Sequence, residues 1–185
     1  AGGGFHSNDA RGTTTTIDPS TGKETSRVTP LVRSRGGELG IRTRLIPGLQ
    51  SSLVAYRLDY DSELLFVGDA GTTEPSRPSR RTGVEWATYY QWNKWLTADM
   101  DVAFARARFR GTAPEGSRIP GAVEGVAAFA LTVNAPAGWS GSLQWRYFGP
   151  RPLVEDNSIR SSSTAQFNGR LGWSAARDVR IELEG

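Results

Sequence analysis

Cysteine is absent from this 185-residue chain, and histidine and methionine occur once each. The absence of cysteine excludes a disulfide framework, a thiol nucleophile and a cysteine-based metal site. A Ser-His-Asp triad or a histidine-rich zinc site would depend on His6 alone. The chain also has no run of about 18 apolar residues, so the sequence predicts no transmembrane helix.

The charge is too small to indicate a nucleic-acid partner. There are 22 Lys and Arg against 19 Asp and Glu, a net charge of +3, and the basic residues are dispersed along the chain. Apolar residues make up only 37% of the chain, whereas six tryptophans and 22 glycines are present. Few apolar residues together with many tryptophans are unusual for a small soluble core.

Both ends of the chain resemble the middle of a longer protein. The first residues, Ala-Gly-Gly-Gly-Phe-His, have neither the basic nor the apolar region of a signal peptide. The last residues stop within an alternating apolar and polar pattern. We expect a fragment of a larger protein; a short domain with frayed ends is the alternative.

Hydrophobic residues recur with a period of two almost everywhere, which is typical of β-strands. In residues 166–174, for example, Phe167, Leu171 and Trp173 alternate with polar or small residues. No segment shows a helical period. The predicted strands span residues 1–8, 34–46, 49–67, 80–93, 95–110, 121–135, 138–150, 162–175 and 178–185.

The connections between these strands alternate in length. Tight turns are predicted at residues 46–48, 93–94, 135–137 and 176–177. Longer polar connections are predicted at residues 9–33, 68–79, 111–120 and 151–161. Short turns on one side and long loops on the other are typical of a transmembrane β-barrel. The sequence therefore predicts an all-β, antiparallel up-and-down transmembrane barrel, of which this chain supplies about nine strands.

Aromatic and charged residues support the barrel. Trp92, Trp95, Trp139 and Trp173 lie next to the short turns, as expected for one interfacial girdle. Phe66, Phe109 and Phe148 lie next to the long loops, as expected for the other. In the segment 54–61 we assign Val54, Tyr56, Leu58 and Tyr60 to the apolar side. The side expected to face a lumen carries Arg42, Arg44, Arg57, Asp59, Asp61, Glu85, Gln91, Asp99, Asp101, Glu124, Gln144, Arg146, Asn168, Arg170, Arg180 and Glu182.

Several segments resemble TonB-dependent outer-membrane receptors, in the order in which that family has them. They are residues 2–12 (GGGFHSNDARG), 35–43, 62–71, 80–86, 119–122 and 147–153. The resemblance implies a large barrel of roughly 22 strands that a separate N-terminal domain plugs. Residues 1–185 would all belong to the later part of this barrel, without the plug.

The same resemblance implies a function and its partners. Such receptors lie in the outer membrane of a Gram-negative bacterium, in contact with its lipid. They bind a scarce solute such as an iron–siderophore or cobalamin, and import it with energy supplied through the TonB complex. The candidate ligand contacts in the outer loops are His6, Asn8, Asp9, Arg11, Arg77, Arg80 and Arg81. Solvated loop charges, or contacts with anionic lipid, are the alternative for each of them.

Two other classes stay open from the sequence: a passive porin-type channel and a soluble β-sandwich binding module. We expect no cofactor, no resident metal and no enzymatic activity. No cluster of nucleophile, base and acid is visible, and the carboxylate pairs Asp59/Asp61 and Asp99/Asp101 fit a lumen lining.

Overall fold

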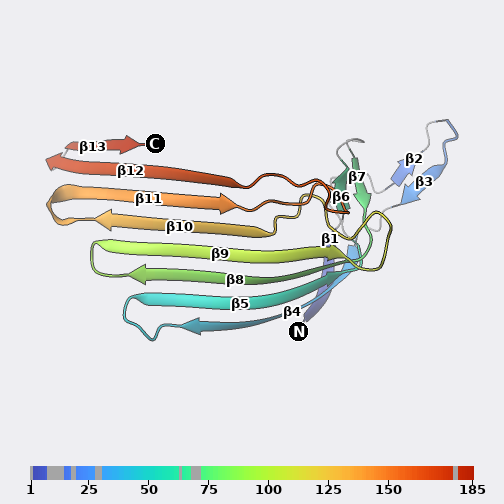
Figure 1. The fold of residues 1–185 in the computed structure, drawn as a ribbon, viewed down its shortest axis with the longest axis horizontal. Coiled ribbons are helices and arrows are strands. Elements are labelled where there is room, and N and C mark those ends of the chain that lie inside the picture. Colours follow the sequence, from blue (N-terminus) through green and yellow to red (C-terminus); the bar gives the residue numbers. More distant parts are fainter. Residues whose placement is uncertain are drawn as a thin grey trace.

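A computed structural model describes residues 2–7, 15–17, 20–27, 31–62, 64–67, 72–176 and 179–185. Nine strands form one antiparallel sheet, and their order in space is their order along the chain (Figure 1). They are β1 (Gly2–Ser7), β4 (Leu31–Thr43), β5 (Leu49–Tyr60), β8 (Ser79–Gln91), β9 (Leu96–Phe109), β10 (Gly125–Asn134), β11 (Trp139–Phe148), β12 (Thr164–Ala176) and β13 (Val179–Glu184). The predicted all-β up-and-down fold is confirmed.

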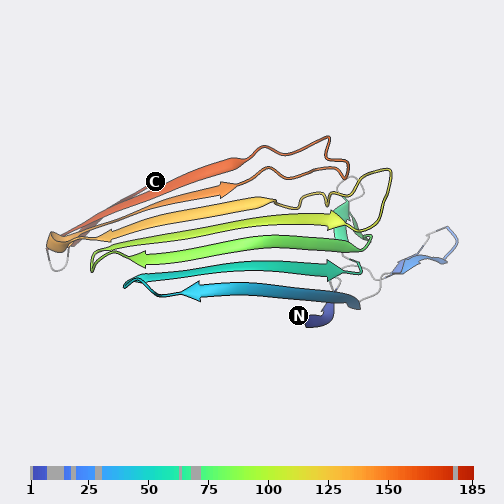
Figure 2. The same cartoon turned by 60° about the horizontal axis from the view of Figure 1, so that its bottom comes forward.

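The connections alternate as the sequence predicts. Those after β4, β8, β10 and β12 are short, and those after β1, β5, β9 and β11 are long and gather at the opposite end of the sheet (Figure 2). The connection between β10 and β11 is a 3-10 turn, η1 (Pro136–Gly138), in which Ala137 and Gly138 have positive φ angles of 68° and 83°. No helix in the described residues is long and apolar enough to span a membrane.

Two of the long connections carry hairpins of their own. β2 (Thr15–Ile17) pairs with β3 (Glu24–Arg27), and β6 (Leu64–Val67) pairs with β7 (Thr72–Pro75). The predicted strand 49–67 is therefore wrong at its end. β5 ends at Tyr60, and the backbone N–H of the next residue, Asp61, donates to the carbonyl of Arg33 in β4 at 3.1 Å.

The register divides the sheet into two faces. Residues directly opposite each other on antiparallel neighbours point to the same side, and Ile41, Leu53, Trp86, Val102 and Ala127 follow one another across β4, β5, β8, β9 and β10. The apolar face defined in this way includes Leu39, Ile41, Leu53, Val84, Trp86, Val102, Phe104, Ala127, Phe129, Leu131, Leu143, Trp145, Phe167, Leu171, Trp173, Ile181 and Leu183.

The apolar face is uncovered in the described part of the chain. Leu39, Phe167 and Leu183 keep 82%, 66% and 74% of their surface exposed. Three polar side chains on this face are bonded to one another: Trp86 Nε1 donates to Ser51 Oγ at 2.9 Å, and Ser51 Oγ lies 2.8 Å from Thr88 Oγ1. Lipid cannot form hydrogen bonds in place of water, so polar atoms can face it only when they bond within the protein, as these do.

The opposite, polar face carries Glu38, Arg42, Tyr56, Arg81, Glu85, Asp99, Asp101, Gln144, Arg146, Asn168, Arg170, Arg180 and Glu182. The sequence assignment of β5 is wrong, because Arg57 and Asp59 lie on the apolar side and Tyr56 and Leu58 on the polar side. Both alternate sets of this strand contain apolar residues, so pairing with β4 and β8 decides which set faces which way.

The predicted aromatic girdle is correct at one end only. Trp139 and Trp173 stack on the apolar face beside the short turns, with ring centroids 5.7 Å apart. At the other end Phe148 lies on the polar face, opposite Val126. Phe109 is buried beneath the long loops, where it packs with Ala107 and Ile119 in the only buried cluster of the described residues.

The fold rules out the soluble sandwich. A sandwich needs two sheets whose inner faces pack on each other. In the described residues, the nine strands of the main sheet form a single layer, and the two further sheets are two-stranded hairpins of three or four residues per strand.

Candidate functional site

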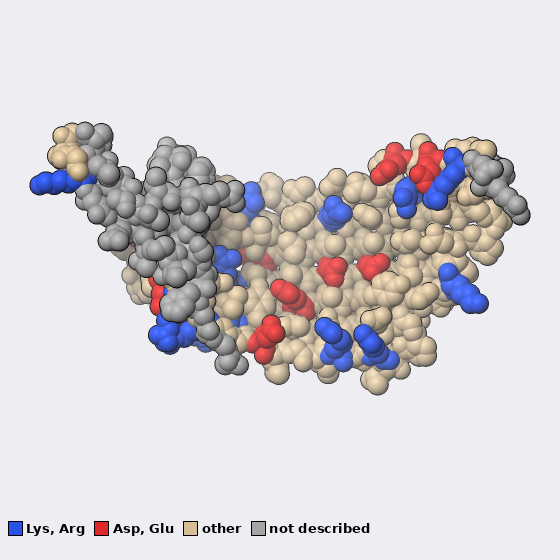
Figure 3. Space-filling view, turned by 180° about the vertical axis from the view of Figure 1, so that it is seen from behind, with Lys and Arg blue, Asp and Glu red and all other residues tan. Residues whose placement is uncertain are grey.

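The polar face is the first part of the candidate site. One row across it contains Arg42, Ser52, Ala87, Asp101 and Ala128, one residue from each of five neighbouring strands. The small residues separate the charged ones. Figure 3 shows acidic side chains along the middle of this face, with basic side chains on both sides of them.

Hollows form where small residues lie between these charges. One, of about 220 Å³, is lined by residues of β4, β5, β8 and β9, including Arg42 and Asp99, and by Arg44 just after β4. Another, of about 160 Å³, lies between Asp99, Asp101 and Arg146. Charges of both signs beside open volume are suited to holding water or a polar solute, and not to a dry core.

The long loops are the second part, and ion pairs join three of them. Arg77, before β8, bonds to the Glu155 carboxylate in the loop after β11 and donates to the carbonyl of Gly116 at 2.8 Å. Its guanidinium also lies 4.6 Å from the centroid of the Phe109 ring. In the loop after β9, Glu124 pairs with both Arg118 and Arg160.

Backbone bonds reinforce this junction. The N–H of Arg118 donates to the carbonyl of Glu155 at 2.9 Å, and the N–H of Gly121 donates to the carbonyl of Pro152 at 2.8 Å. In the loop after β11, Ser158 donates from its N–H and its hydroxyl to the Asp156 carboxylate, and these bonds lower the pKa of Asp156. The loops after β5, β9 and β11 therefore form one connected layer at this end of the sheet.

The structure does not bring the predicted site residues together. Arg77 belongs to the loop junction. Arg80 and Arg81 are neighbours on β8 and so point to opposite faces: Arg80 pairs with Asp59 at 2.7 Å on the apolar side, whereas the Arg81 guanidinium lies 5.9 Å from the Tyr60 ring on the polar side. His6 pairs in register with Val32. Asn8, Asp9 and Arg11 lie outside the described residues.

The sequence alone did not predict two groups of residues. The loop junction is one, because Arg77 and Glu155 are 78 residues apart in the chain. The other is a set of arginines at the outer end of the apolar face, among them Arg106 and Arg108. The sequence did contain a signal for the arginines: Arg106 and Arg108 are alternate residues of β9 on the same side as Val102 and Phe104.

Comparison with known proteins gives the family. The model of the TonB dependent receptor-like β-barrel matches residues 4–185. The chain belongs to this family. The family is one of transport receptors and not a class of enzymes, and its members are outer-membrane proteins.

Solved structures share the fold of this receptor barrel. The ferric yersiniabactin uptake receptor FyuA from Yersinia pestis is 19% identical with a TM-score of 0.75, over 98% of this chain and 28% of that one. The ferric-catecholate import receptor Fiu from K12 E. coli is 14% identical with a TM-score of 0.72, over 98% and 27%. The copper transporter OprC is 17% identical with a TM-score of 0.61, over 83% and 25%.

The chain therefore spans about a quarter of the length of the receptors that it resembles. No curated protein matches its sequence.

Proposed function

We propose that this chain forms part of the wall of an outer-membrane receptor that imports a scarce solute, such as a metal chelate or cobalamin. Energy comes from the TonB complex. All 185 residues belong to the barrel, and the plug and the TonB-contacting segment lie elsewhere in the protein. The observation that carries the proposal is the division of one sheet of this family into an apolar and a polar face.

The division of faces supports a barrel wall in a membrane. An outward apolar face with an inward polar one is the arrangement by which strands cross a bilayer and enclose water. The polar face, with its hollows between charges of both signs, is suited to lining the path of a hydrated solute.

The names of the related receptors support one class of solute. FyuA and Fiu carry ferric chelates according to their names, and OprC carries copper. We propose a metal chelate as the solute class. The arginine of the polar face nearest the loops, Arg81, is the predicted contact that is best oriented toward such a solute, because a guanidinium bonds well to the carboxylate or catecholate oxygens of a chelate.

The test is metal uptake by cells that express the protein from its full reading frame. Cells lacking the gene, cells lacking TonB and cells treated with an uncoupler are compared for uptake of labelled iron chelates, copper and cobalamin. We expect one solute to require both the protein and TonB. Uptake that needs the protein but neither TonB nor the proton gradient would show a passive channel instead.

Arg81 and Arg80 provide a matched pair for the same assay. Arg81→Ala removes a charge-assisted contact of about 1.5–3 kcal/mol, so we expect uptake at limiting solute to fall by about tenfold or more. Arg80→Ala removes the same charge from the apolar side and leaves solute affinity unchanged.

A further inference from the structure

A group of arginines lies at the outer end of the apolar face. Two neighbouring rows of the sheet contain it: Arg35, Asp59, Arg80 and Arg108 follow one another across β4, β5, β8 and β9, and the adjacent row has Gly37, Arg57, Thr82 and Arg106 in the same order. We call Arg35, Arg57, Arg80, Arg106 and Arg108 the arginine rows. These two rows hold five arginines and a single acid.

The acid neutralises only part of the arginine rows. Asp59 pairs with Arg57 at 2.9 Å and with Arg80 at 2.7 Å. Arg110, just beyond β9, pairs with Asp61 at 3.2 Å. Among the described residues no acidic side chain pairs with Arg106 or Arg108, so two like charges lie on one strand face two residues apart.

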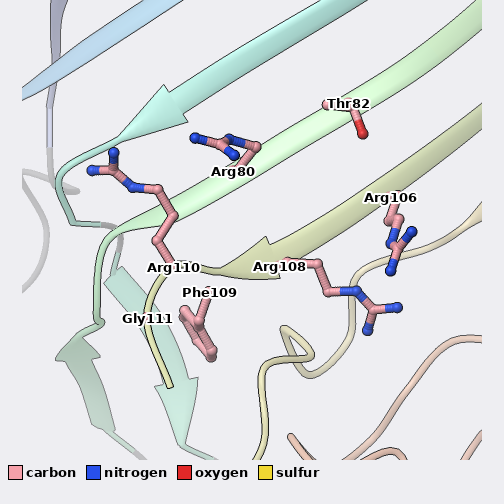
Figure 4. Close-up of a pocket in the computed structure, with 7 residues that line it drawn as sticks. All are labelled: Arg80, Thr82, Arg106, Arg108, Phe109, Arg110 and Gly111. Carbon is pink, nitrogen blue, oxygen red and sulfur yellow. The ribbon is translucent and has the colours of Figure 1, made fainter. Parts of the chain in front are cut away.

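A hollow of about 430 Å³ opens between these side chains. Arg80, Thr82, Arg106, Arg108 and Arg110 line it, and Figure 4 shows the guanidinium groups of Arg106 and Arg108 extending from β9 to the same side. Several guanidinium groups around one open space form a site for an anion, because each presents a fork of N–H donors to phosphate or carboxylate oxygens.

The position of the rows limits which anion can bind. The next row toward the short turns is Leu39, Ala55, Val84 and Phe104, so the surface changes from arginine to apolar within two residues, about 7 Å along a strand. A solute on the polar side cannot reach the rows, since the sheet lies between. An anion that binds here therefore belongs to a molecule whose apolar part rests on the apolar face.

We propose that the arginine rows bind the phosphate groups of an outer-leaflet lipid, specifically a glycolipid with two phosphates on its head. The acyl chains lie along Val84, Trp86 and Phe104, and one phosphate lies between Arg106 and Arg108. Two phosphates suit the site better than one, because the hollow is lined by two pairs of arginines. Arg106 and Arg108 have no acidic partner among the described residues, and Arg80 and Arg110 each have one but keep further N–H donors for an anion. The inference rests on the membrane location in the proposed function.

The test measures lipid retained by the protein expressed from its full reading frame. The protein is purified in a neutral detergent and titrated with lipid A carrying both phosphates, and bound lipid is measured by native mass spectrometry. The Arg106→Gln, Arg108→Gln double variant is expected to retain at least tenfold less. The control, Arg42→Gln with Arg44→Gln, removes two arginines that line a hollow of the polar face, one on β4 and one just after it, and is expected to retain lipid as the wild type does.

Each other outcome contradicts the proposal. Equal retention of lipid A without phosphates, or an equal loss in the control variant, would show that apolar contact or general charge is responsible. Equal competition by phosphatidylglycerol or by inorganic phosphate would overturn the choice of a diphosphorylated lipid, and a second protein copy in place of lipid would overturn the occupant.

A second variant keeps the test decisive where the glutamine pair does not fold. Arg106→Lys with Arg108→Lys keeps the charge but loses the forked hydrogen bonds, so we expect a several-fold loss, and unchanged retention would contradict the site. Solute uptake provides an independent readout. If the lipid proposal is wrong, lipid retention will not depend on Arg106 and Arg108, whether or not solute uptake is observed. If the transport proposal is wrong, TonB-dependent uptake will be absent, but lipid retention will still depend on these two arginines.

Discussion

Placing an arginine on each side of β10 tests the assignment of the two faces. Ala127 lies on the apolar face between Val102 and Tyr147, whereas Ala130, on the same strand, lies on the polar face between Asp99 and Gln144. Ala127→Arg puts a charge into the apolar face. Ala130→Arg puts the same side chain beside a carboxylate and an amide.

The free-energy cost expected for Ala127→Arg depends on how far the residue lies from the bilayer midplane. On β10 the rows of the apolar face run from Gly125, opposite Phe104, to Val133, opposite Leu96, and Phe129 lies in the middle of them. Ala127 is two residues from it, about 7 Å along the strand. An outward arginine costs about 2–4 kcal/mol at the midplane and about 0–1 near the interface. We therefore expect about 2 kcal/mol for Ala127→Arg, about a 30-fold loss in the folding constant, and close to zero for Ala130→Arg.

Urea unfolding of the full-length protein in phospholipid vesicles measures this difference. The folded fraction is read from its faster migration in unheated gel samples. We expect the Ala127→Arg midpoint to fall and the Ala130→Arg midpoint to stay near that of the wild type. An equal or larger loss for Ala130→Arg would refute the assignment of faces.

Three further results are expected. Arg77→Ala removes the contacts with Glu155, the Gly116 carbonyl and the Phe109 ring, worth about 1–3 kcal/mol when partly buried; it should speed cleavage of the outer loops by an external protease, and Arg151→Ala, an exposed arginine, should not. Gly116→Ala would press Cβ against the carbonyl oxygen of Glu155 and should destabilise the loops by several kcal/mol. Gly121→Ala has open space around it and costs about 1–2 kcal/mol for its φ of +79°. A loop proteolysis series that ranks the two variants equally would contradict the junction. The 185-residue chain alone leaves β1 and β13 at the edges of the sheet, so in detergent-free buffer it should elute as aggregate and not as a folded monomer.

The strands and their connections could be predicted because their signals are local. A period of two, interrupted by Gly, Pro and Asn, marks where each strand begins and ends within a few residues, as at Leu49 and Ser79. The small hairpins were missed because β6 and β7, at four residues each, are too short to show a period. β5 ends before β6 because it stops pairing with β4 there, and the local sequence pattern carries no information about that pairing.

The faces could be predicted only where one alternate set is clearly polar. In β9 and β12 this holds, and Asp99, Asp101, Asn168 and Arg170 lie on the polar face as expected. In β5 Leu53 and Val54 are adjacent and equally apolar, so the neighbouring strands decide, and Arg57 lies on the other side from the one expected.

The candidate site was least predictable, because it depends on distant residues. The spacing of Arg80 and Arg81 alone shows that they point to opposite sides, yet which side faces the solute follows from the register of β8 with β5 and β9. The pairing of Arg77 with Glu155 requires the loops before β8 and after β11 to meet. No local pattern encodes that meeting.

The most direct test of the barrel wall is a cysteine scan along β10 (Gly125–Asn134). These 185 residues contain no cysteine. A charged, water-soluble maleimide is applied to intact outer membranes containing the full-length protein, and labelling of the protein without an introduced cysteine is subtracted, so that each introduced thiol reports on one position. We predict labelling at Ala128 and Ala130 on the polar face and protection at Ala127, Phe129 and Leu131 on the apolar face. Uniform labelling along the strand, or labelling of the odd positions, would contradict the account.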